Sequence, residues 1–256
     1  MCTETNALPP SPSSWRMNVS TLRIEKARLN ACKIYSFFQC LGIGCRGVVW
    51  SLKSDDGKMQ AIKLNYSPLT IKEEFNIPFS WPNYTVGLSL HPKGFIPSAA
   101  PYIPEMIVMP KYDGTLKNYL TKLSIRERLD AICQISTGLK TLHALGLFHN
   151  DLNLSNIAYH IENKRFDIID FGKTERDASL MDNDVRELKN ILVSILMGDE
   201  NVLLTFEKLG VSEASLCDAG FNPEICPLIM RTLETLPDTA VEISFVFSAL
   251  QSRLLH

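Results

Sequence analysis

Three polar side chains in the middle of the chain have the types and the order that phosphoryl transfer from a nucleotide requires. Asp151 and Asn156 lie in the stretch His149-Asn-Asp-Leu-Asn-Leu-Ser-Asn156, which fits H-x-D-x-x-x-x-N. Asp170 begins an Asp-Phe-Gly triplet directly behind the apolar run Phe166-Asp-Ile-Ile169, which predicts a strand. Phosphoryl transfer needs one carboxylate to orient the accepting hydroxyl, and an amide oxygen with a second carboxylate to hold magnesium against the phosphates. Either motif alone would be weak, but the pair in this order indicates that chemistry.

A glycine-rich motif upstream supplies groups that could contact the phosphates. The stretch Gly42-Ile-Gly44-Cys-Arg-Gly47-Val-Val49 fits G-x-G-x-x-G-x-V, and Lys63 follows it. Dinucleotide-binding folds use the same glycine spacing, but there a helix follows directly. Here an apolar run, a turn at Ser54-Asp-Asp-Gly57 and a second run ending at Lys63 predict a β-hairpin instead. The hairpin favours a loop whose glycines let the backbone close over phosphates, with the lysine as their cationic partner.

With both halves in place, the chain from Phe37 to Gly198 resembles the protein-kinase-like fold. The resemblance implies an α+β, two-lobed architecture, with a small β-rich N-lobe that carries one helix and a mainly helical C-lobe. We expect a disordered Pro/Ser-rich tail at 1–20, an N-lobe at 21–110 and a C-lobe with a truncated activation segment at 111–256. The resemblance also implies ATP and Mg²⁺ as cofactors.

The same resemblance implies roles for the polar residues of the motifs. The catalytic residues would be Asp151, Lys63 and Asn156, and the metal ligands would be Asn156 and Asp170. Kinases usually pair the lysine with a glutamate on the N-lobe helix, which is expected to end at Pro78. Glu74 fits this role better than Glu73, because its apolar neighbours would then face inward.

For ATP, the resemblance implies a site lined by both motifs and by a hinge. The residues expected to contact ATP are Gly42, Gly44, Gly47, Val49, Ala61, Lys63, Met109, Pro110, Tyr112 and Asp170. Val49 and Ala61 would sandwich the adenine, and Met109 would be the gatekeeper residue. Pro110 falls where only a carbonyl is needed and Tyr112 where the amide is used, so the proline is compatible with the site.

Three departures distinguish the chain from kinases that are switched on by phosphorylation. Asn150 replaces the arginine that normally binds a phosphate on the activation loop. Asn153 stands where protein kinases usually have a lysine that contacts the transferring phosphate. Eleven residues separate Gly172 from Asp184, which resembles the aspartate that opens the large C-lobe helix and braces the catalytic loop. So short a segment cannot hold an activation loop and a peptide-docking platform.

These features predict a minimal, constitutively active kinase, similar to the compact kinases that bacterial pathogens deliver into host cells. Its substrate would be Ser or Thr of a folded protein partner, with a host ubiquitin-conjugating enzyme or chaperone as candidates. One alternative is a small-molecule phosphotransferase of the aminoglycoside or choline kinase type, which uses H-x-D-x-x-x-x-N without the lysine. Another is a partner-binding module in which catalysis is secondary.

Composition limits the setting in which the protein works. The 256 residues carry a net charge of −2 and are 45% hydrophobic, so no basic excess points to nucleic acid. No apolar run is long enough for a membrane span, and no signal-peptide pattern opens the chain. The seven cysteines form no C-x-x-C pair and are interpreted as reduced thiols. We therefore expect a cytosolic monomer, or an effector secreted into a host cell without a cleaved signal peptide.

Overall fold

The computed structural model describes residues 36–43, 47–53, 57–65, 71–96, 105–199 and 211–254. The predicted tail at 1–20 lies outside these residues, as does Gly44. The chain divides into two compact units, and each is described by itself. Unit 1 comprises residues 1–71 and 93–109, and unit 2 comprises residues 72–92 and 110–256. The predicted division into lobes at residue 110 stays a prediction.

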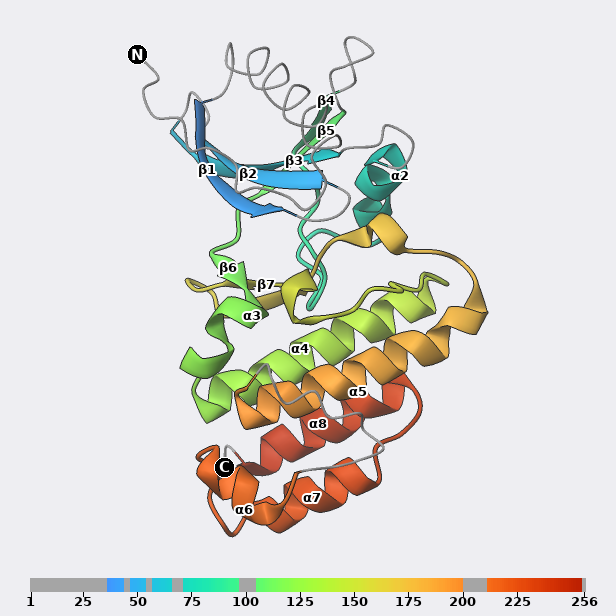
Figure 1. Ribbon diagram of the computed structural model, residues 1–256. Coiled ribbons are helices and arrows are strands. Elements are labelled where there is room, and N and C mark those ends of the chain that lie inside the picture. Colours follow the sequence, from blue (N-terminus) through green and yellow to red (C-terminus); the bar gives the residue numbers. More distant parts are fainter. Residues whose placement is uncertain are drawn as a thin grey trace, which may run out of the picture. The chain divides into compact units, whose positions relative to one another are not determined.

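Unit 1 contains a five-stranded sheet in the order β1-β2-β3-β5-β4 (Figure 1). Its strands are β1 Ser36–Ile43, β2 Gly47–Lys53, β3 Met59–Asn65, β4 Gly94–Ile96 and β5 Met106–Pro110. The first two pairs of neighbours, β1 with β2 and β2 with β3, are antiparallel. The predicted hairpin is therefore present, and no helix follows the glycine motif directly, so the dinucleotide fold is excluded.

The turn before β3 and the side chains of β2 explain why this hairpin forms. Gly57 adopts a φ of 81°, which costs glycine little because it has no Cβ. In β2, Val48, Trp50 and Leu52 alternate along the strand and are all buried. Ser51 between them is also buried, but the large apolar side chains recur at every second position, as is typical of a strand that packs one face on a core.

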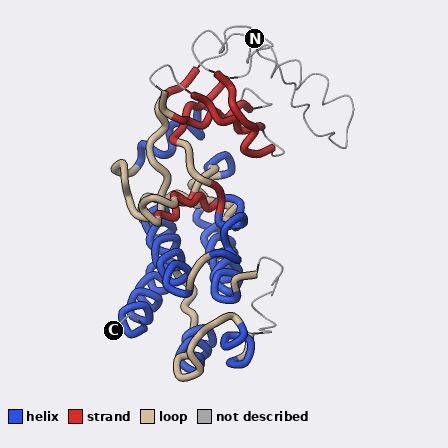
Figure 2. The backbone as a smooth tube through the Cα atoms, turned by 90° about the vertical axis from the view of Figure 1, so that its left-hand side faces the viewer, coloured by secondary structure: helices blue, strands red, loops and turns tan. Residues whose placement is uncertain are grey.

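Unit 2 is mainly helical and contains a small three-stranded sheet in the order β6-β7-β8. Its strands are β6 Gly114–Thr115, β7 Ile157–His160 and β8 Arg165–Ile168. Its α-helices are α2 Ile71–Asn76, α3 Leu116–Tyr119, α4 Ile125–Ala144, α5 Met181–Met197, α6 Glu213–Asp218, α7 Cys226–Glu234 and α8 Ala240–Leu254. The first residue of α2, Ile71, belongs to unit 1. Short 3₁₀ helices are η1 Ile77–Ser80, η2 Leu120–Lys122, η3 Leu154–Asn156, η4 Phe171–Lys173 and η5 Ala178–Leu180. Figure 2 shows the long helices of this unit from a second direction.

The central helix of unit 2 is α4, which contacts α5, α8 and β8. It starts with a capping box in which the Ser124 side chain accepts from the Glu127 backbone N–H and Glu127 accepts from the Ser124 backbone N–H. Leu129, Ile132, Ile135, Leu139 and Leu142 recur at helical spacing and are all buried. After the helix, Gly146 has a φ of 65°, the left-handed conformation that glycine commonly adopts where a helix ends. The apolar spacing from Ile125 to Leu145, followed by Gly146, predicts this helix from the sequence, and α4 confirms it.

The segment before unit 2's small sheet differs in part from the prediction. Helix α2 ends at Asn76, and the chain continues as η1 with Pro78 in its first turn. A proline fits there because the first N–H groups of a helix have no acceptor within the helix. The α-helix itself therefore ends one residue before the predicted last residue, Ile77, and only 3₁₀ structure continues past Pro78. Further along, Gly87 packs so closely on Gly138 of α4 that a Cβ on Gly138 would lie 2.2 Å from the Gly87 carbonyl oxygen.

Within the described ranges, no helix combines the length and the apolar character that crossing a membrane would need.

Candidate active site

The loop that carries Asp151 is anchored by hydrogen bonds to Asp184 of α5. The two carboxylate oxygens of Asp184 accept hydrogen bonds from the backbone N–H groups of His149 and Asn150, each at 2.7 Å. The Nε2 atom of His143 lies 3.0 Å from the same carboxylate. Asp184 is fully buried, so these bonds replace the water that its charge has lost. The predicted bracing role fits this geometry, although α5 begins three residues earlier, at Met181, than the sequence suggested.

A second carboxylate of α5 holds the same loop. The Oε2 atom of Glu187 accepts a hydrogen bond of 2.7 Å from the Leu152 backbone N–H. Burial raises the pKa of Glu187, and this hydrogen bond partly offsets that effect. Sequence reasoning missed Glu187, but it stands three residues after Asp184 and therefore on the same helix face. That spacing was the signal that could have identified it.

His149 is part of the interior of this loop. Its side chain is fully buried, and its Nε2 atom lies 3.0 Å from the carbonyl oxygen of Ile169. Burial lowers the pKa of His149, so the neutral imidazole is favoured. The neutral ring must carry its proton on Nε2 to donate to that carbonyl. His149 is therefore a packed residue that supports the loop.

Asp151, Asn153 and Asn156 are held together by the backbone of the loop. The Nδ2 atoms of Asn153 and Asn156 both donate to the Asp151 carbonyl oxygen, at 2.9 and 2.8 Å. Because a carbonyl can only accept, the amide nitrogen of Asn156 must face it, and the amide oxygen faces the other way. That free oxygen and the Asp170 carboxylate are the hard oxygen ligands that Mg²⁺ prefers. The residues present therefore fit a magnesium ion.

Asp170 is the N-cap residue of η4 and adopts a left-handed conformation, with φ 64° and ψ 68°. Aspartate visits this region more readily than most residues, because its short side chain can hydrogen-bond locally. The turn directs the next side chain, Phe171, into the interior, where it is 4% exposed. The Phe171 ring packs against Trp81 at 5.1 Å and against His149 at 5.5 Å, measured between ring centroids. The Asp-Phe-Gly triplet is thus fixed by the core of unit 2.

The last residue of η4 also reaches the catalytic loop. The Nζ atom of Lys173 lies 2.8 Å from Oδ1 of Asp151, and both side chains are partly exposed. Two residues further on, Glu175 and Phe148 exchange backbone hydrogen bonds of 2.8 and 3.0 Å. These contacts hold the first part of the segment 173–180 against the catalytic loop.

A buried polar network connects Arg165 and Asp167, both on β8, with Tyr112. The Nε atom of Arg165 lies 2.7 Å from both carboxylate oxygens of Asp167, and its NH2 group donates to the carbonyls of Thr85 and Leu88. The Tyr112 hydroxyl donates to Asp167 at 3.0 Å. Burial raises the pKa of Asp167 to about 6, and the hydrogen bonds from Arg165 and Tyr112 offset only part of that effect. Sequence reasoning considered only the backbone amide of Tyr112 and missed this role of its hydroxyl.

In unit 1, the register of the hairpin brings several predicted ATP contacts to one face. Val49 of β2 is the pairing partner of Lys63 of β3, and Ala61 lies two residues before Lys63. Directly paired residues, and residues two apart on one strand, share a face of the sheet. Gly42 pairs with Val49 from the other side. The structure therefore brings these residues together, while their contact with ATP stays a prediction.

The other predicted contacts lie on several elements. Gly47 starts β2, Met109 and Pro110 end β5, and Gly44 lies outside the described residues. On α2, Glu74 is 7% exposed whereas Glu73 is exposed, which agrees with the choice of Glu74 as the inward-facing residue. The pairing of Glu74 with Lys63 stays a prediction.

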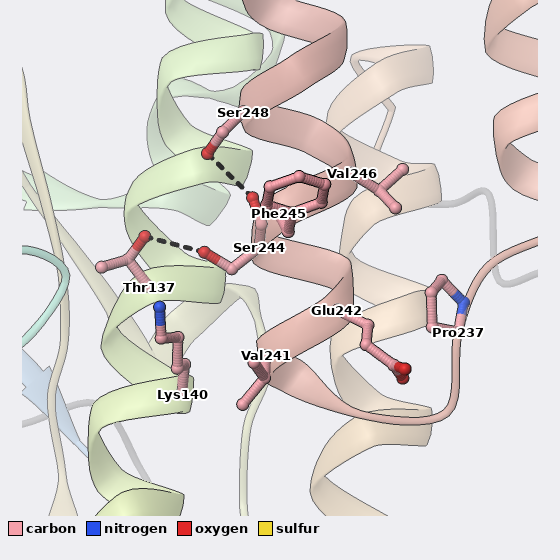
Figure 3. A pocket seen from close by; sticks show the side chains of 9 residues that line it. All are labelled: Thr137, Lys140, Pro237, Val241, Glu242, Ser244, Phe245, Val246 and Ser248. Atoms are coloured by element: carbon pink, nitrogen blue, oxygen red, sulfur yellow. Dashed lines mark hydrogen bonds between the residues drawn. The ribbon is translucent and has the colours of Figure 1, made fainter.

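A cavity of about 660 Å³ in unit 2 is lined by residues of α4 and α8 and by Pro237 (Figure 3). Val241 and Phe245 of α8 line it and are 52% and 76% exposed. Beside it, the hydroxyls of Thr137 and Ser244 are hydrogen-bonded at 3.1 Å. None of its lining residues belongs to the predicted site, so it does not bear on the chemistry above.

Comparison with known proteins supports the kinase-like interpretation. Residues 106–214 match the model of the lipopolysaccharide kinase (Kdo/WaaP) family, a stretch that contains the catalytic loop and the Asp-Phe-Gly triplet. No curated protein matches the sequence. Among solved structures, the chain is similar to Rad53 1-466 in complex with AMP-PNP, with 19% identity and a TM-score of 0.63. That similarity covers 83% of this chain and 64% of the other, so the chain spans less than two thirds of the solved protein.

These comparisons establish the fold more firmly than the substrate. In all, 1957 solved chains match the structure, so the fold alone does not identify the molecule that is phosphorylated. The family match covers less than half of the chain, but its members are kinases, which transfer phosphoryl groups from ATP. The protein has an α+β, kinase-like fold, as the sequence predicted, and ATP-dependent phosphoryl transfer is the chemistry that its family similarity indicates.

Proposed function

We propose that the protein transfers the γ-phosphoryl group of ATP to a hydroxyl group, with Asp151 as the residue that orients the acceptor. The observation that carries this proposal is the arrangement of Asp151 and Asn156 around one backbone carbonyl, with the loop anchored on Asp184. Fixed positions matter here because the protein's contribution to phosphoryl transfer is mainly positioning and charge stabilisation. The resemblance supports Lys63 and the glycine motif as the phosphate contacts.

In the proposed reaction, the side chains of unit 2 have different roles. The Asp151 carboxylate accepts a hydrogen bond from the acceptor hydroxyl and takes its proton as the new P–O bond forms. Asn156 and Asp170 would hold magnesium, which neutralises negative charge on the phosphates when it is bound. The Asp184 carboxylate keeps the loop in place and does not contact the substrate. Burial of His149 and Phe171 beneath the loop keeps its backbone in one conformation.

The short segment after the Asp-Phe-Gly triplet supports an acceptor other than an extended peptide. The first part of the segment 173–180 is held by the Phe148–Glu175 bridge and by Lys173, and helix α5 begins directly after the segment. A groove for an extended peptide needs a free strand or a platform at this place. The family similarity supports a sugar hydroxyl of a lipopolysaccharide-type glycolipid as the acceptor.

A second candidate acceptor is Ser or Thr on the surface of a folded protein. The short segment supports this candidate equally, because docking of a folded partner replaces the contacts of a peptide groove. The resemblance to compact effector kinases favours a host protein as that partner. For this candidate, a short peptide copied from the phosphorylation site should have a much lower kcat/KM than the intact partner.

Labelled ATP distinguishes the two acceptors. The purified protein is incubated with Mg²⁺ and γ-labelled ATP, in one arm with dephosphorylated lipopolysaccharide and in the other with proteins of a cell lysate. Label in the glycolipid supports the first candidate, and a discrete protein band supports the second. In either arm the label must disappear in Asp170→Asn. Absence of ATP turnover in both arms and without acceptor would contradict the proposed function.

We expect the activity to be independent of phosphorylation of the protein itself. Thr174 and Ser179 are the hydroxyl residues of the segment 173–180, and Asn150 stands where an arginine would bind their phosphates. The backbone bonds of Glu175 with Phe148 hold the first part of the segment and η5 orders its last part, so a phosphate has little left to order. Protein made in a heterologous host should keep its rate of ATP turnover after phosphatase treatment. Ser179→Glu should leave the rate within about twofold of wild type, and a large loss in either case would reveal a switch.

A further inference from the structure

The cationic residue beside the candidate acceptor site does not come from the expected position of the chain. In the kinases that the chain resembles, a lysine two residues after the aspartate contacts the transferring phosphate, and this chain has Asn153 there. The Nδ2 atom of Asn153 donates to the Asp151 carbonyl at 2.9 Å, and its Oδ1 atom accepts from the Ser155 N–H at 2.9 Å. Both polar atoms of Asn153 are therefore used within the loop, and the side chain is neutral.

Lys173 brings an ammonium group to this place from another element. It ends η4, directly after the Asp-Phe-Gly triplet, and its Nζ atom lies 2.8 Å from Oδ1 of Asp151. The two side chains are 38% and 34% exposed, so both remain accessible to reactants. If Asp151 orients the acceptor as proposed, a group that hydrogen-bonds its carboxylate would also lie within reach of the phosphoryl group that is transferred to that acceptor.

The contribution of the Lys173–Asp151 ion pair to the stability of the fold is too small to explain why the pair is there. A partly exposed lysine–carboxylate pair contributes at most about 1 kcal/mol, because water screens it and two side chains lose freedom. Lys164 and Glu127 form such a pair at 3.2 Å on the surface of the same unit. A positive charge next to the carboxylate that orients the acceptor would instead stabilise the negative charge of the phosphoryl group during transfer. At such a place, one positioned donor has a large effect on the rate.

We propose that Lys173 is a phosphate-contacting catalytic residue that replaces the lysine missing at position 153. This inference rests on the proposed function. As the acceptor oxygen attacks the γ-phosphorus, the bond to the bridging oxygen of ADP breaks and ADP leaves with the electron pair. The acceptor proton goes to Asp151, and the Lys173 ammonium donates to a non-bridging oxygen of the phosphoryl group. Lys173 keeps its proton throughout.

Lys173→Met tests the proposal, because methionine keeps the length of the side chain and removes its charge. With MgATP and water as acceptor, release of inorganic phosphate should fall about 10²–10³-fold in kcat, while KM for ATP changes less than about threefold. Lys164→Met, which removes the comparable surface ion pair, should stay within about twofold of wild type. The melting temperatures of both variants should remain within a few degrees of the wild-type value.

Two further measurements separate contact with phosphate from mere support of Asp151. Wild type should bind MgADP more tightly when fluoroaluminate, a mimic of the transferring phosphoryl group, is added, and Lys173→Met should lose this gain while binding MgADP alone normally. The double variant Asn153→Lys/Lys173→Met should recover at least about tenfold of the lost rate, because it returns the ammonium from the other position.

The results also distinguish this inference from the proposed function. If wild type is active and Lys173→Met retains both its kcat and the fluoroaluminate effect, the role of Lys173 is wrong and the proposed function stands. If wild type neither binds nor hydrolyses MgATP, the proposed function is wrong, and the role of Lys173 falls with it.

Discussion

Asp151→Asn should abolish most of the phosphoryl transfer while leaving nucleotide binding nearly intact. The change removes a negative charge and keeps the shape of the side chain, so the loop hydrogen bonds to the Asp151 backbone can persist. A positioned general base contributes about 10²–10⁴-fold to a rate, and we expect a loss in kcat of that size. The dissociation constant for MgATP should change less than about threefold, because the carboxylate acts on the acceptor.

Asp170→Asn should behave differently, because this residue is proposed to hold magnesium. Its variant should lose magnesium-dependent nucleotide binding as well as turnover, as calorimetric titration with and without Mg²⁺ will show. Asp182→Asn is the matched control, since it neutralises an exposed carboxylate in the first turn of α5. Near-normal turnover in both Asp151→Asn and Asp170→Asn would contradict the kinase assignment.

Arg165→Ala should destabilise the protein by about 3–5 kcal/mol, because it leaves a buried carboxylate without its cation. Asp167 is fully buried, and Arg165 lies 2.7 Å from both of its carboxylate oxygens. The substitution also leaves the carbonyls of Thr85 and Leu88 without a charged donor. Urea denaturation followed by circular dichroism measures the change in the free energy of unfolding. The exposed Arg126→Ala should change it by less than about 0.5 kcal/mol.

A double variant and the pH dependence of stability test whether the unpaired charge of Asp167 causes the loss of stability in Arg165→Ala. Arg165→Met/Asp167→Leu removes both charges and should be more stable than Arg165→Ala, despite two substitutions.

Asp167 has a pKa of about 6 in the folded protein and an ordinary value of 3.8. The folded state therefore binds this proton more tightly, and ionisation of Asp167 costs stability above that range. Without Arg165, which lowers the pKa of Asp167, that pKa should lie above its wild-type value of about 6. The stability deficit of Arg165→Ala should therefore shrink as the pH falls from about 8 towards about 6 and level off below, where both folded proteins bind the proton. A deficit that is constant between about pH 8 and 6 would contradict a charge effect.

The sequence could predict those features whose causes are close together along the chain. Helix α4 follows from apolar side chains at helical spacing between a capping box at Ser124 and the glycine stop at Gly146. The hairpin of unit 1 follows from two β-forming runs around a glycine turn. Asp151 and Asn156 could be paired in advance because only four residues separate them, and a short loop keeps them near each other. In each case, local backbone geometry limits the possible outcomes.

Contacts between distant segments could be predicted only where a family pattern supplied them. The bracing of His149 by Asp184 was expected from the resemblance, but the second anchor, Glu187, was not. No local signal connects Trp81 with Phe171, because the two lie far apart along the chain and only packing in the core brings their ring centroids to 5.1 Å. The start of α5 at Met181 was also missed, because that first turn lacks the capping signal that marks α4.

What the sequence determined by itself is the chemistry of the groups: two carboxylates and an amide in the order that phosphoryl transfer uses, glycines and a lysine on a hairpin, and too short a segment after the Asp-Phe-Gly triplet for a peptide platform. What only the tertiary structure decided is which groups meet. Residue type and spacing fix charge and local direction, but a contact between segments depends on how the helices and strands pack. The ion pair of Lys173 with Asp151, and the burial of Asp167 beneath Arg165 and Tyr112, arise from that packing.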